Sequence, residues 1–202
     1  MSLALLWREL SLGLCRIVDT FFDDERCYLV TTPNPGAKPL EGRRLQILEA
    51  VVAGVEQKTV AIDFDLAPST IALTARMGLS ALGVQCRPSR VHPLLMLAAI
   101  ATRQRDPRIL ASLSFFSIGE TQLRVLSVAR PDKALAGSLP PAELAVIRSF
   151  VEGASYSSIS SERGTSPRTI ANQITAVFRR LKVSGRGELM LRLFADSGAI
   201  LR

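Results

Sequence analysis

The chain repeats itself at a spacing of 99 residues, and this repeat limits the possible folds more than any other feature. Residues 40–87 align with 139–186 without a gap. About three identical pairs are expected by chance from ordinary residue frequencies. The alignment contains clearly more identical pairs than that. The identical pairs include Leu40/Leu139, Leu45/Leu144, Gly54/Gly153, Pro68/Pro167, Thr70/Thr169, Ile71/Ile170, Ala72/Ala171, Leu82/Leu181, Val84/Val183 and Arg87/Arg186. We therefore interpret the sequence as a tandem duplication.

Each copy predicts the same order of elements. A helical stretch (3–13 and 93–104) precedes two β-rich runs around a turn (16–32 and 111–130). Paired runs of this kind predict a β-hairpin, and a block of short helices follows. We expect an α+β fold, mainly α, that duplicates a helix, β-hairpin and helix-turn-helix unit. The expected domains are 1–39 (helix and hairpin), 40–103 (first, degenerate helix-turn-helix), 104–138 (second hairpin and linker) and 139–202 (second helix-turn-helix).

The two hairpins are expected to depend on each other. An isolated two-stranded hairpin is marginally stable in water, so the apolar residues of both hairpins need a cover. We expect the hairpins to join, or to face each other, about a pseudo-twofold axis, with the helix at 93–104 serving both halves. The alternative is two independent units on Pro- and Gly-rich linkers at 32–39 and 129–141.

The second helical block has clear start and stop signals. Gly153 ends its first helix and Gly164 ends a short second helix. Ser166 is a good N-cap for a third helix, and Pro167 is a good first residue. An apolar stripe and a polar stripe then run along opposite faces of that helix. The apolar stripe is Ile170, Ile174, Val177, Phe178 and Leu181, and the polar stripe is Arg168, Asn172, Thr175, Arg179 and Lys182.

Residues 139–193 resemble the C-terminal DNA-binding domain of LuxR-type transcription regulators. The shared pattern is Leu139, Pro141, Glu143, Gly153, Ser166, Thr169, Ile170, Arg179, Arg180, Leu181, Val183 and Arg186. The chain departs from that pattern at Pro140, where the family prefers Ser or Thr, and at 156–158, where the family usually has a charged pair. The resemblance covers about a quarter of the chain.

The resemblance implies that 166–182 is a recognition helix lying in the major groove of duplex DNA. The implied base contacts are Ala171, Asn172 and Thr175, since Asn can pair with adenine and Ala can meet the thymine methyl group. Phosphate contacts supply affinity and register more than sequence choice. The implied phosphate contacts are Arg168, Thr169, Gln173, Arg179, Arg180 and Lys182.

The first copy keeps the apolar stripe and loses the polar one. Between residues 66 and 84 there is one basic residue, against four between 165 and 183. Such a helix has too few cations to hold a duplex by counterion release. Ala67 replaces the capping Ser166. We expect this copy to act as a scaffold or as an interaction surface formed by Leu73, Arg76 and Met77.

Composition excludes several other classes of protein. The formal net charge of +7 favours an anionic partner, and no nucleotide-binding or hydrolase motif is present. A single histidine and three cysteines without CxxC spacing make a metal site improbable on sequence grounds, so we expect buried structural cysteines. We expect no enzymatic activity, no cofactor and no membrane span, and we expect a cytoplasmic chain whose partner is double-stranded DNA.

Two functions stay open at this stage. The first is a DNA-binding regulator that acts through 166–182, with a homodimer or another regulatory protein as a further partner. The second is a protein-interaction module that binds another regulator or RNA polymerase without binding DNA itself. The basic residues on the polar face of 168–182 distinguish the two functions, because a pure interaction module does not need them.

Overall fold

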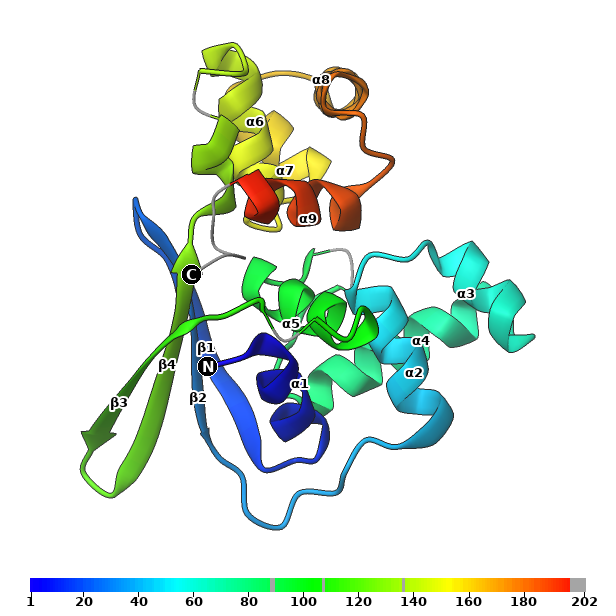
Figure 1. The fold of residues 1–202 in the computed structure, drawn as a ribbon. Helices are drawn as coiled ribbons and strands as arrows, with labels where there is room; N and C mark the ends of the chain where they lie inside the picture. The colour runs from blue at the N-terminus through cyan, green and yellow to red at the C-terminus, as the bar shows by residue number, and fades with distance from the viewer. Residues whose placement is uncertain (88–89, 107, 136, 197–202) are drawn as a thin grey trace.

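A computed structural model describes residues 1–87, 90–106, 108–135 and 137–196, so the last six residues of the expected 139–202 domain lie outside it. Two rounds of elements follow each other along the chain (Figure 1). Each round has one helix, then a pair of strands, then a group of helices. The first round is α1 (Leu3–Ser11), β1 (Cys15–Phe22), β2 (Arg26–Pro33), α2 (Gly42–Val52), α3 (Gln57–Phe64) and α4 (Pro68–Ala81). The second is α5 (Pro93–Arg103), β3 (Ser112–Ile118), β4 (Thr121–Ala129), the short 3₁₀ helix η2 (Pro131–Leu135), α6 (Pro141–Val151), α7 (Tyr156–Arg163), α8 (Pro167–Leu181) and α9 (Arg186–Asp196).

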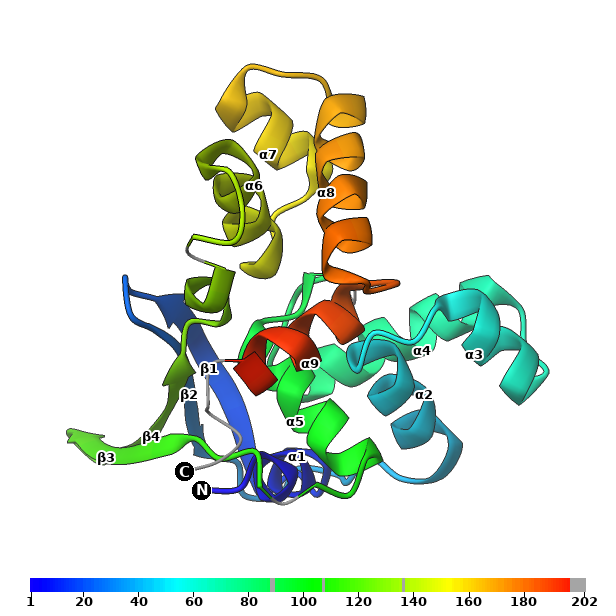
Figure 2. The same ribbon diagram turned by 45° about the horizontal axis from the view of Figure 1, so that its top comes forward.

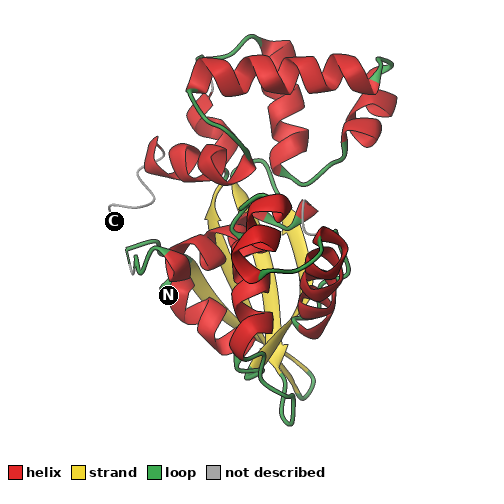
Figure 3. Ribbon diagram, turned by 90° about the vertical axis from the view of Figure 1, so that its right-hand side faces the viewer, coloured by secondary structure: helices red, strands yellow, loops and turns green. Residues whose placement is uncertain are grey.

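The two hairpins form one antiparallel sheet in the order β1-β2-β4-β3. The second strand of each hairpin pairs with the other, with Leu29 opposite Leu126 and Val30 opposite Val125. The expectation that the hairpins join is therefore confirmed. Helices cover one side of this sheet (Figure 3). Leu29 and Leu126 are buried, whereas Phe21, Phe115 and Phe116 stay exposed, so only part of the apolar surface of the hairpins is covered.

Helix α5 is the centre of the molecule. Its residues from Pro93 to Ala101 are all buried, and the helix packs against α1, α2, α9 and β2. This burial explains the longest apolar run of the sequence, because a helix that is apolar all round belongs in a core. No helix in the described part of the chain is long and apolar enough to cross a membrane.

One hydrophobic core spans both rounds of elements. It extends from Leu3 in α1 to Phe194 in α9 and includes most of α5. Two glycines bring the rounds together: a Cβ on Gly54 would lie 2.9 Å from Gly187 Cα, and one on Gly153 would lie 2.7 Å from Arg90 O. The alternative of two independent units on linkers is therefore wrong, because the described residues share a core.

The helices of the two triplets start at matching positions. α2, α3 and α4 begin at 42, 57 and 68, and α6, α7 and α8 begin at 141, 156 and 167, so each start recurs 99 residues later. The second helix of each triplet ends in the left-handed conformation, at Asp65 with φ 50° and at Gly164 with φ 60°. The expected helix at 166–182 is α8, with Ser166 and Lys182 as its caps.

The segment expected to be a second linker is partly built into the fold. Residues 131–135 form η2, and Asp132, Leu135 and Leu139 are buried. The Pro and Gly content of 129–141 predicted a loop, but Arg130 and Asp132 are fixed by buried ion pairs. These ion pairs are described with the candidate interface below.

Candidate nucleic-acid interface

Helix α8 lies at an outer corner of the molecule (Figure 2). The side chain of Ser166 accepts a hydrogen bond from the backbone N–H of Thr169 at 3.1 Å, and Pro167 is the first helical residue. Ser166 thus satisfies one of the amides that a helix start leaves without a partner. The expected N-cap is confirmed.

The inner face of α8 packs on the rest of its triplet. Ile170, Ile174, Val177 and Leu181 are buried. Phe178 is half-buried, and its ring meets the Phe150 ring edge-on at 5.9 Å between centroids. This stripe fixes the rotation of α8 about its own axis, because a turned helix would expose it.

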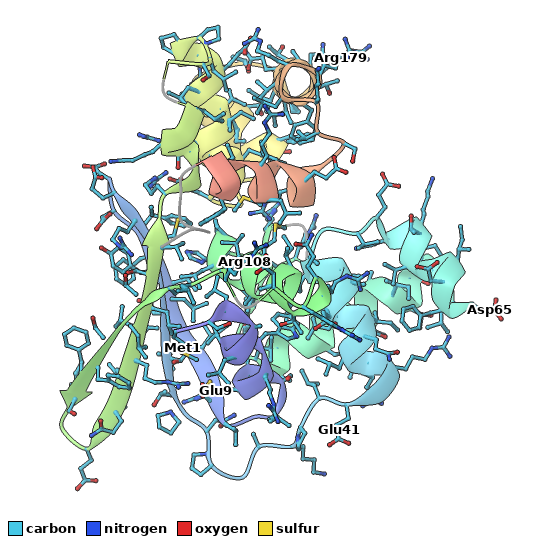
Figure 4. All side chains as sticks on the ribbon, in the orientation of Figure 1. Met1, Glu9, Glu41, Asp65, Arg108 and Arg179 are labelled. Carbon is cyan, nitrogen blue, oxygen red and sulfur yellow. The ribbon has the colours of Figure 1, made fainter. Side chains whose placement is uncertain are left out.

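The outer face of α8 carries the predicted polar stripe. Arg168, Asn172, Thr175 and Arg179 are all exposed. Arg179 points away from α6 and α7 (Figure 4). Four side chains that could reach a DNA groove therefore stand on one face of a helix whose opposite face is buried.

The residues predicted to contact bases differ in their exposure and in the hydrogen-bonding groups that remain available. Asn172 is exposed, and its amide can donate and accept hydrogen bonds. The Thr175 hydroxyl donates to the backbone oxygen of Ala171 at 2.8 Å, so its oxygen remains available as an acceptor. Ala171 is half-buried and offers part of its methyl group. Asn172 is the best placed of the three for reading a base edge.

The residues predicted to contact phosphates fall into two groups. Arg168, Arg179 and Lys182 are exposed cations, and Lys182 takes a left-handed conformation with φ 54°. The exposed Thr169 lies beside the N-cap, with its hydroxyl 3.0 Å from Ser166 Oγ. The exposed members of this first group suit contact with a backbone that carries negative charge.

The second group, Gln173 and Arg180, is engaged or partly buried within the protein. Arg180 donates to Glu143 at the start of α6, with 2.6 Å between Nη1 and Oε2. Gln173 is half-buried, and its Oε1 is buried without a hydrogen-bond partner among the described residues. Arg180 therefore ties α8 to α6, and a variant of it tests packing as well as DNA contact.

Helix α4 shows a different outer face at the matching positions. Ala67 makes no side-chain cap. Leu73 is 52 % exposed and Met77 is 58 % exposed, with Arg76 exposed beside them. On α3, Ile62 is 81 % exposed. The predicted interaction residues thus share an exposed and largely apolar face.

A buried ion network that the sequence did not reveal connects the second triplet to the sheet. Arg130 donates to Asp132 at 3.1 Å, to Glu152 at the C-cap of α6, and to the backbone oxygen of Asp23 at 3.0 Å. Arg148 donates to Asp132 at 2.9 Å. Arg130 and Asp132 are 5 % and 1 % exposed. In the sequence, the only sign of this network is the opposite charge of Arg130 and Asp132, two residues apart.

Arg186, part of the motif at 139–193, connects the two halves of the chain. Its Nη2 donates to the backbone oxygen of Val91 at 2.8 Å and to that of Val151 at 2.9 Å. Burial lowers its pKa to about 10, so the side chain stays protonated at neutral pH. It holds the end of α6 and the segment before α5 together.

The other candidates for chemistry are structural. Cys15 and Cys27 are buried free thiols, as expected, whereas Cys86 is only half-buried. Burial raises the pKa of Cys27 to about 12. His92 caps α5, since its Nδ1 accepts from the backbone N–H of Leu94 at 3.3 Å. Burial lowers the pKa of His92 to about 4, so it is neutral at pH 7. Among the described residues, no group of three or more His, Cys, Asp and Glu could hold a metal ion.

Comparisons of this chain with protein-family models, with curated proteins and with solved structures find no match.

Proposed function

We propose that this protein is a DNA-binding transcription regulator of the LuxR-type helix-turn-helix kind that acts through α8. The observation that carries the proposal is the outer face of α8, where Arg168, Asn172, Thr175 and Arg179 stand exposed above a buried apolar stripe. A helix of this kind, preceded by the short α7 and a turn, is the arrangement that inserts into a major groove.

We also propose that the two halves of the chain arose by tandem duplication. The support is the recurrence of three helix starts at a spacing of 99 residues, together with the pairing of the two hairpins. In this view the first copy gave up DNA contact and became the scaffold that holds the second. The protein then presents one competent recognition helix per chain, and a palindromic site requires two chains.

Selection from a pool of random DNA duplexes tests the proposed function. We expect the full chain to enrich one short sequence motif at low salt. Asn172→Ala should keep the fold and change base preference at one position, by about 1–3 kcal/mol. No enrichment by the folded, unsubstituted protein would contradict the proposal.

A second function is favoured by the exposed apolar face of α4 at Leu73 and Met77. We propose that this face binds a second copy of the chain or another regulatory protein. Leu73→Asp with Met77→Asp should abolish self-association in sedimentation equilibrium and leave the DNA affinity of a single chain unchanged. A monomeric unsubstituted protein would exclude the homodimer.

A further inference from the structure

A cavity of about 560 Å³ lies between the two halves of the chain. The first half contributes the end of α2, the start of α3 and the segment before α5. The second half contributes residues of α5, α6, α7 and α8 and the first residue of α9. This size is within the range of small-molecule sites, which often lie where two parts of a protein meet.

One wall of this cavity is positively charged. Arg87 and Arg90 line it from the first half and Arg186 from the second. A neighbouring cavity of about 860 Å³ shares Arg87 and Arg90 and adds Arg76 from α4. Arg87 and Arg90 thus stand where the two cavities meet.

Nothing acidic balances this wall. None of the described residues that line the two cavities is Asp or Glu. Ion pairs of the described residues engage other arginines of the chain, but none involves Arg76, Arg87 or Arg90. Positive charges gathered in a cleft raise the local concentration of anions.

Aromatic side chains line the cavity beside these arginines, and the guanidinium carbon of Arg186 lies 5.9 Å from the centroid of the Phe150 ring. These side chains are Phe150, Phe178 and Tyr156, and the Phe150 ring lies 5.9 Å from the Phe178 ring and 6.1 Å from the Tyr156 ring between centroids. A DNA phosphate could reach the arginines at the rim but would leave these rings unused. A molecule with both an anionic group and an apolar body would contact both the arginines and the rings.

We propose that this cavity binds a small organic anion with an aromatic or apolar body, whose carboxylate, phosphate or sulfonate is held by Arg87 and Arg90. Guanidinium groups suit such oxyanions because their planar forks can donate two hydrogen bonds to one group. The site goes beyond the proposed DNA contact. Because Phe178 belongs to α8, a bound ligand touches the back of that helix.

Two fluorescent probes that differ in charge test this site in the full chain. 1-Anilinonaphthalene-8-sulfonate carries a sulfonate, and N-phenyl-1-naphthylamine has the same aromatic body without it. We expect the first to bind one site per chain. In Arg87→Gln with Arg90→Gln its Kd should rise at least about tenfold, which corresponds to about 1.4 kcal/mol. The Kd of the neutral probe should change less than about twofold.

The matched control is Arg16→Gln with Arg44→Gln, which removes two exposed charges outside both cavities. It should leave the Kd of both probes unchanged. Ala154→Trp, which places a large side chain in the cavity lining, should weaken both probes while the thermal transition stays cooperative.

Three outcomes would overturn the proposal. The sulfonate probe could bind the Arg87/Arg90 variant as tightly as the unsubstituted chain. The control pair could lose as much affinity as the Arg87/Arg90 pair. Or the Arg87/Arg90 variant could keep the probe and lose salt-dependent affinity for random duplex DNA, which would assign these arginines to the DNA backbone.

Discussion

Helices α4 and α8 occupy matching places in their triplets and show opposite surfaces to solvent. Both bury an apolar stripe, which includes Ile71 and Leu79 in α4 and Ile170 and Ile174 in α8. Outside that stripe, Leu73 of α4 stands where α8 has Asn172. Folding constrains the inner face, because it must fill a core, whereas the outer face is free to change its chemistry.

The two triplets also differ in how they are held. The buried residues of α6, α7 and α8 belong to the central core. The outer part of α2, α3 and α4 has a smaller core of its own, which includes Ala50, Ala61 and Ala75. Only the second triplet has a buried ion network against the sheet, among the residues that the structure describes. The triplet that carries the proposed DNA contacts is therefore fixed by both apolar and ionic contacts.

The largest expected effect tests this difference in anchoring. Asp132→Ala removes the buried carboxylate that pairs with Arg130 and leaves the partly exposed Glu152 as its other partner, and breaking a buried pair costs about 3–5 kcal/mol. We expect that loss in the free energy of unfolding, measured with denaturant. If the variant does not fold, Arg130→Met with Asp132→Leu should recover most of the stability, since an apolar pair can replace a buried ion pair.

Asp106→Ala provides the control for that measurement. Asp106 pairs with Arg108, whose side chain is 67 % exposed, so its loss should matter little. Equal losses for Asp106→Ala and Asp132→Ala would mean that the buried network does not anchor the second triplet.

The next effect concerns α5, which packs against α2 of the first triplet and against α9, the helix that follows the second triplet. Burial lowers the pKa of His92 in the folded chain to about 4, below the usual value of about 6.5 in an unfolded chain. The unfolded chain therefore binds more protons between these values, and stability falls as the pH falls from about 6.5 toward 4. The full loss is about 2–3 kcal/mol.

His92→Asn isolates this effect, because Asn can cap a helix but does not titrate in this range. The variant should show a nearly flat stability between pH 6.5 and 5. Hydrogen exchange at pH 5.5 should show α2–α4 and α6–α8 losing protection together in the unsubstituted chain. Loss in one triplet alone would show that α5 does not couple them.

The smallest expected effect separates the two helix starts. Ser166→Ala should cost about 1 kcal/mol in unfolding free energy, because it removes the cap of α8. Ala67→Ser should stabilise the chain by a similar or smaller amount, since Ala67 already has the extended backbone of an N-cap, with φ −63° and ψ 142°. A loss of stability in Ala67→Ser would show that the two helix starts are not equivalent.

The sequence predicted the elements better than it predicted their anchoring. Helix starts and caps are local signals, so Ser166, Pro167 and Gly164 placed the bounds of α7 and α8 closely. The joining of the hairpins followed from the marginal stability of each hairpin alone. These inferences needed only neighbouring residues or the internal repeat.

Long-range polar contacts could not be predicted in the same way. Arg130 reaches Glu152, the C-cap residue of α6, and Asp23 in the first hairpin, and nothing in the chain order pairs them. Arg180 stands in the basic run at the end of α8, yet it pairs with Glu143, which lies 37 residues away. The helical period predicts which residues share a face of a helix. The partner of each side chain, in contrast, depends on how the helices pack.

The salt dependence of duplex binding tests the central claim, that α8 and not α4 contacts DNA. Arg168→Ser with Arg179→Ser gives α8 the residues that α4 has at Ser69 and Ser80, and it leaves Arg180 to its contact with Glu143. The account predicts weaker binding to all sequences and a log–log salt slope smaller by about one to two units. Arg16→Ser with Arg44→Ser, which removes the same charge elsewhere, should leave the slope unchanged. An unchanged slope in the α8 variant, or an equal change in both variants, would contradict the account.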